Sequence, residues 1–67
     1  MMNPTQLGEM LVENARAKHG DVVAHPTNMI PSEPFTRFCE GRNFTAADRD
    51  ECVVAYKNRW EILKGDK

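Results

Sequence analysis

The chain has 67 residues, of which 40% are hydrophobic and 28% are charged, and its net charge at pH 7 is −1. This length predicts a single domain over residues 1–67, near the lower size limit at which a hydrophobic core alone stabilises a fold. The charges are spread evenly along the chain, so no basic tail or acidic run indicates a nucleic-acid or cationic partner.

The sequence also predicts a compartment. Its longest run of hydrophobic residues, Cys52 to Tyr56, is far too short to cross a membrane, and the N-terminus lacks the basic and apolar regions of a secretory signal. We therefore expect a cytoplasmic protein with no membrane partner, in which Cys39 and Cys52 are free thiols that pack as small hydrophobic side chains. A disulfide between them is geometrically conceivable across two packed helices.

The first predicted helix covers residues 4–19. Asn3 to Gln6 supplies an N-cap, a proline at the first helical position and a glutamine at the third. Gly20 is placed to end the helix with a positive φ. The apolar stripe recurs at helical spacing through Leu7, Met10, Leu11 and Asn14, with Ala15 beside it.

The crossover from residue 21 to residue 31 has two prolines and no sustained period. Asp21 could cap one helical turn from Val22 to Ala24, or the same residues could lie extended. In both cases the segment is an ordered connection, since it is too apolar for a flexible linker. We expect its apolar side chains to cover the last helix: Val22, Val23, Met29 and Ile30.

A short second helix is predicted from Ser32, its N-cap, to Gly41, which ends it. Phe35, Phe38 and Cys39 share one face of this helix.

The third predicted helix begins after Thr45 and continues to Lys64, without an internal glycine or proline. Thr45 is a good N-cap, and Asp48 can reach back to it as in a capping box. The apolar residues of this helix span roughly 180° of its circumference, which is wider than the stripe of an ordinary surface helix. The sequence therefore predicts an all-α fold, a small compact three-helix domain of long–short–long order packed around Tyr56 and Trp60.

Metal and cofactor chemistry are poorly supported. His19 and His25 have the spacing of half a zinc site, whereas Cys39 and Cys52 are too far apart in the sequence for the other half. The four glycines are scattered, so there is no glycine-rich phosphate loop, and no local signature marks a catalytic nucleophile. We expect no enzyme activity, no metal, no cofactor and no small-molecule substrate.

Nucleic-acid binding is the alternative suggested by the connection between the last two helices, which resembles a helix-turn-helix in outline. A recognition helix would present its first turns to the major groove. Here those turns carry Asp48, Asp50 and Glu51 against Arg49 alone, so a DNA-binding regulator is less favoured than a protein partner.

The leading functional hypothesis is a non-enzymatic protein–protein interaction module, such as an adaptor, inhibitor or accessory subunit, that docks through a helix face. A structural homo-oligomer is a second alternative. Because the preceding helices offer too little cover for the whole apolar arc of the last helix, we expect part of that arc to remain exposed for a partner or for self-association. The expected partner-binding residues are Val54, Ala55, Asn58, Arg59 and Ile62.

Overall fold

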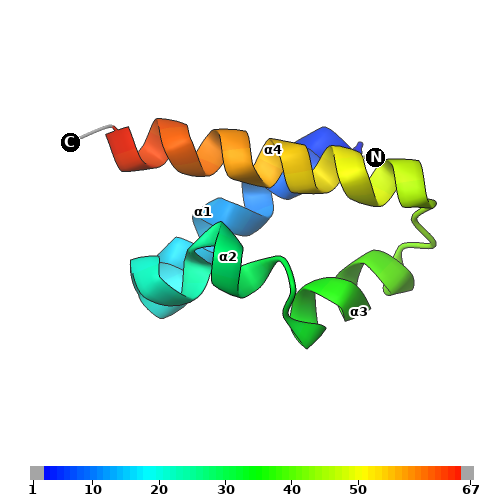
Figure 1. Ribbon diagram of the computed structural model, residues 1–67, viewed down its shortest axis with the longest axis horizontal. Coiled ribbons are helices and arrows are strands. Elements are labelled where there is room, and N and C mark those ends of the chain that lie inside the picture. The colour runs from blue at the N-terminus through cyan, green and yellow to red at the C-terminus, as the bar shows by residue number, and fades with distance from the viewer. Residues whose placement is uncertain (1–2, 66–67) are drawn as a thin grey trace.

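The computed structural model describes residues 3–65, and over this range the chain forms four helices and no strand (Figure 1). The predicted all-α fold is confirmed, and the crossover contains one short helix that the sequence did not predict. None of these helices is long and apolar enough to span a bilayer. In chain order the helices are α1 (Pro4–Ala24), α2 (Pro26–Met29), α3 (Glu33–Gly41) and α4 (Ala46–Gly65).

The predicted caps are present at the three longer helices. Asn3 and Gln6 form a reciprocal capping box at the start of α1. Thr45 Oγ1 accepts a hydrogen bond from the Asp48 N–H at 3.1 Å, and the Asp48 carboxylate accepts one from the Thr45 N–H at 3.2 Å. Ser32 Oγ accepts from the Phe35 N–H at the start of α3. Each cap satisfies a backbone donor that the first helical turn leaves free.

Gly20 interrupts α1 without ending it. Its φ of 85° is a conformation that residues with a side chain rarely adopt, and the chain then makes one further helical turn to Ala24. The helical alternative for residues 22–24 is therefore the observed one. The turn points Ala24 into the core, where it is fully buried, while Val22 is 78% and Val23 is 47% exposed. The expectation that these two valines cover the last helix is wrong.

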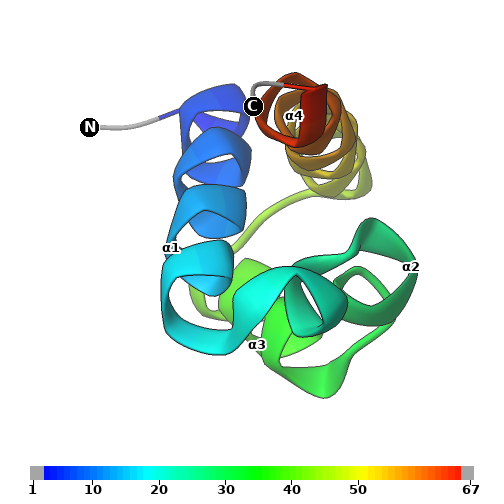
Figure 2. The ribbon, with the colours of Figure 1, turned by 90° about the vertical axis from the view of Figure 1, so that its left-hand side faces the viewer.

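Helices α1 and α4 cross obliquely and form the main packing interface (Figures 1 and 2). Thr5 at the start of α1 donates a hydrogen bond to Glu51 near the start of α4, and Glu13 pairs with Arg59 two turns later. Between these contacts Gly8 lies so close to α4 that a Cβ atom would sit 2.5 Å from the carbonyl oxygen of Cys52. The crossing thus depends on a residue without a side chain.

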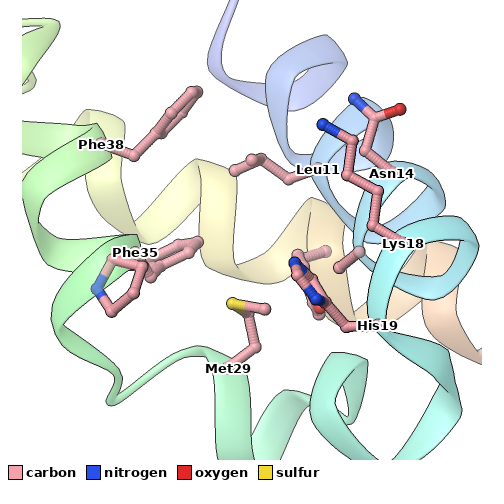
Figure 3. Close-up of a pocket in the computed structure, with 10 residues that line it drawn as sticks. Leu11, Asn14, Lys18, His19, Met29, Phe35 and Phe38 are labelled. Atoms are coloured by element: carbon pink, nitrogen blue, oxygen red, sulfur yellow. The ribbon is translucent and has the colours of Figure 1, made fainter.

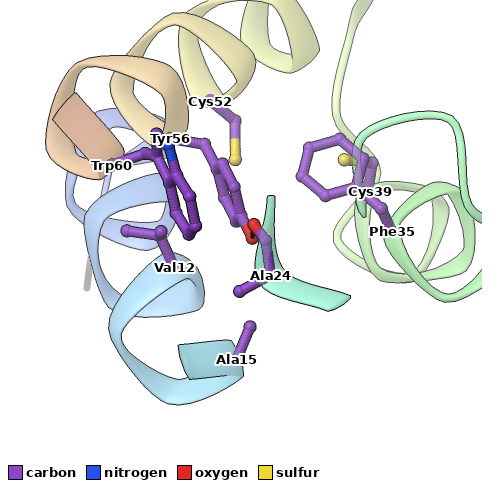
Figure 4. Close-up of a cluster of buried hydrophobic side chains, with 8 residues drawn as sticks. All are labelled: Val12, Ala15, Ala24, Phe35, Cys39, Cys52, Tyr56 and Trp60. Atoms are coloured by element: carbon purple, nitrogen blue, oxygen red, sulfur yellow. Dashed lines mark hydrogen bonds between the residues drawn. The ribbon is translucent and has the colours of Figure 1, made fainter. Parts of the chain in front are cut away.

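The core is built where α1, α3 and the crossover meet α4 (Figure 4). Tyr56, Val12 and Cys52 are fully buried, and Trp60 is 7% exposed, so the central positions predicted for Tyr56 and Trp60 are confirmed. The apolar face of α1 differs from the predicted one, because Val12 is buried in the core and Asn14 is exposed. Tyr56 Oη donates a buried hydrogen bond to the carbonyl oxygen of Ala24, which ties the kinked end of α1 to α4.

Candidate docking surface

An apolar groove opens between α1 and α3 (Figure 3). It has a volume of about 210 Å³. Leu11 stands on its α1 wall, Phe35 and Phe38 form its α3 wall, and Ala15 and Tyr56 contribute to its lining from the core side. Met29 closes one end, so the expectation that the crossover supplies apolar cover is confirmed for Met29, which packs on the core. We call this feature the α1–α3 groove.

A second hollow adjoins the α1–α3 groove and shares His19, Met29 and Pro34 with it. Val22 and Val23 line this second hollow, which extends the apolar surface around the kinked end of α1. Val22 is 78% and Val23 is 47% exposed at this hollow. The two hollows together form an elongated apolar strip rather than an enclosed cavity.

The α1–α3 groove carries a cation in its lining, because Lys18 lies on its α1 side. The Arg42 guanidinium lies 4.6 Å from the ring centre of Phe38, but Arg42 does not itself line the groove. No carboxylate lines either hollow within residues 3–65. The four ion pairs of the described chain are Arg16–Asp21, Arg37–Glu33, Arg59–Glu13 and Lys64–Glu61, so neither Lys18 nor Arg42 is neutralised by one of them.

The surface of α4 that the sequence suggested for a partner is only partly available. Val54 is 55% and Ile62 is 59% exposed, and Asn58 lies exposed between them, so their predicted exposure is confirmed. Ala55 was expected on the same surface, and this is wrong: it is 6% exposed because α1 approaches it closely at Gly8.

Arg59 is drawn towards α1 by its ion pair with Glu13 at 3.3 Å. Val54 and Ile62 are eight residues apart, or roughly 12 Å along a helix. With a polar residue between them they form two separate apolar points and not a continuous patch. A role in binding for Val54, Asn58, Arg59 and Ile62 stays a prediction.

The four residues considered as metal ligands do not come together at one site. His19 lines the α1–α3 groove, whereas the His25 ring packs edge-on against Trp60 with ring centres 5.2 Å apart. His25 Nδ1 also accepts a hydrogen bond from the Thr27 N–H. Cys39 and Cys52 are buried in the core. No cluster of three or more potential ligands occurs in the part of the chain that the structure describes.

The two cysteines are free thiols in one core cluster. Burial, reinforced by the neighbouring Cys39, raises the pKa of Cys52 to about 11. Burial also raises the pKa of Cys39, against the opposing effect of the nearby Arg49 guanidinium. Both thiols are therefore protonated at neutral pH, a state in which cysteine is a poor nucleophile. They pack as small hydrophobic side chains, as the sequence suggested.

Neither a protein-family model, nor a curated protein, nor a solved structure matches this chain. Its function is therefore inferred from the surface described above.

Proposed function

We propose that this chain is a small non-enzymatic protein-interaction module that binds a partner protein through the α1–α3 groove. The observation that carries the proposal is the groove itself, an open apolar strip that the chain's own side chains leave unfilled. Bulky apolar walls beside a polar rim are typical of surfaces that receive anchor residues of a partner. The separate apolar points on α4 offer much less continuous area.

Helix-turn-helix DNA binding gains no support from the arrangement of α4. Its first turns carry Asp48, whose carboxylate caps the helix, and Glu51, whose carboxylate accepts a hydrogen bond from Thr5. These groups place negative charge where a recognition helix would meet phosphate.

Site-specific photo-cross-linking in cells that express the protein natively would test the proposal. Asn14 and Asn58 form a matched pair, since both are asparagines within helices, one lining the groove and the other on the outer surface of α4. A benzophenone amino acid at position 14 should yield a discrete cross-linked protein that is missing when the same group replaces Asn58.

Three outcomes would overturn the proposal. Cross-linking from position 58 alone would move the docking surface to α4. A product of twice the chain's own mass would indicate the homo-oligomer. No product from either position would remove the support for an interaction module.

A further inference from the structure

We propose that the α1–α3 groove binds an amphipathic helix of the partner protein, with bulky apolar side chains between α1 and α3 and a carboxylate beside Lys18. This inference rests on the proposed function and specifies the chemistry of its partner.

The shape of the groove favours a helix as the occupant. Its walls are two helices, with Leu11 on one side and Phe35 and Phe38 on the other, and it continues past Met29 towards Val22. An amphipathic helix fills such a strip with apolar side chains spaced three, four or seven residues apart. Small-molecule sites, by contrast, enclose their ligand and surround it with several converging polar groups.

The charges specify which amphipathic helix fits. Lys18 lines the groove and has no ion-pair partner within residues 3–65. The acidic residues of α3 do not line the groove. Glu33 pairs with Arg37 and lines a separate hollow, and Glu40 follows Phe38 by two positions, roughly 200° around the helix.

On α1, Asp21 pairs with Arg16, and Glu9 and Glu13 line a different hollow that shares only Asn14 with the groove. A partner with a carboxylate beside its apolar anchors therefore meets Lys18 where no acid lines the groove, whereas a basic partner would be repelled.

A peptide selection tests this inference, because it offers the groove many candidate helices at once. The probe is a displayed library of 20-residue peptides with helix-forming backbones and randomised faces, selected against the full chain. Enriched peptides should carry large apolar residues at helical spacing together with Asp or Glu next to an anchor. Their dissociation constants should rise as salt is increased, since the ion pair lies at a solvent-exposed rim.

Two exposed lysines provide a matched pair of charge reversals. Lys18→Glu should weaken the selected peptides about tenfold at low salt, because an attraction is replaced by a repulsion of similar size. Lys57→Glu, on α4 away from the groove, should change their affinity less than twofold. Selection against the Lys18→Glu protein should enrich basic peptides in place of acidic ones.

A variant with a larger side chain in the groove tests whether the selected peptides bind there. Ala15→Leu places additional carbon atoms in the groove and should abolish peptide binding, and its melting temperature shows whether it remains folded. If that variant does not fold, competition between each selected peptide and the cross-linker at position 14 locates the binding site instead.

Peptides that bind in the groove but lack carboxylates, or that ignore Lys18→Glu, would overturn the acidic-helix inference and leave the groove as a docking site. Failure to enrich any groove-dependent peptide would overturn the helix inference, whereas the cross-linking at positions 14 and 58 decides the proposed function separately. Concentration-dependent self-association lost on Ala15→Leu would identify a second copy of the chain as the occupant and also overturn the inference.

Discussion

Replacing Gly8 with alanine would test the close crossing of α1 and α4 that holds the fold together. The new Cβ atom would lie 2.5 Å from the Cys52 carbonyl oxygen, 3.0 Å from the Ala55 Cβ atom and 3.2 Å from the Tyr56 backbone nitrogen. Two of these three atoms belong to the backbone of α4, so relief of the clash requires the helices to separate. Overpacking of this kind costs about 1–3 kcal/mol, and the backbone contact places this site in the upper half of that range.

The helix preference of alanine over glycine offsets about 1 kcal/mol of that cost, which leaves a net loss of about 1–2 kcal/mol. For a domain of this size the melting temperature should fall by about 5–15 °C, measured by circular dichroism. Gly41→Ala is the control, because Gly41 ends α3 without a positive φ and no atom lies within 4 Å of the position that its Cβ atom would occupy. It should be neutral or slightly stabilising. A Gly8→Ala protein as stable as the wild type would refute the close crossing.

Trp60→Ala should lose about 3–5 kcal/mol, comparable to the whole stability of so small a domain, and should remove the cooperative thermal transition. Ile62→Glu on the outer surface of α4 should keep the free energy of unfolding within about 0.5 kcal/mol of wild type and leave groove-dependent binding intact. A large loss of stability would place Ile62 in the core, and a large loss of binding would place it in the interface. The pKa of Cys52 is raised to about 11 from an unfolded value of 9.0, so the native state holds this proton more tightly and stability should fall as pH rises from 9 to 11. In urea titrations Cys52 should contribute a loss of about 2 kcal/mol over that interval. Burial also raises the pKa of Cys39 and raises that of Tyr56 to about 12, so these groups add to the fall, and Cys52→Ala should make it shallower without removing it; an equally steep loss in the variant would assign the effect to the other groups alone. Tyr56→Phe should cost about 1–2 kcal/mol in the same assay, because the buried carbonyl of Ala24 loses its donor; an unchanged stability would mean that this hydrogen bond contributes nothing.

Local signals predicted the helices well because their causes are local. The caps at Asn3, Ser32 and Thr45 need only a side chain and a backbone donor three residues away, and all three are observed. The positive φ of Gly20 was expected for the same reason, although the chain continues into another turn beyond it. Burial of Trp60 followed from its position in the middle of the apolar arc on its helix.

Contacts between distant segments could not be predicted in the same way. Nothing in the sequence around Gly8 predicted that a side chain is excluded there, and only its position opposite Ala55 shows why. That approach buries Ala55, which the sequence alone placed on the surface. The α1–α3 groove depends on the distance between α1 and α3. The residue pattern within either helix does not predict that distance.

The most direct test of groove docking is an amide chemical-shift map of the ¹⁵N-labelled chain, titrated with one selected peptide. Docking in the groove predicts that the largest shifts cluster at Leu11, Lys18, Phe35 and Phe38, and that Val54 and Ile62 stay unperturbed. Shifts centred on Val54 and Ile62, with the α1–α3 groove unchanged, would contradict it.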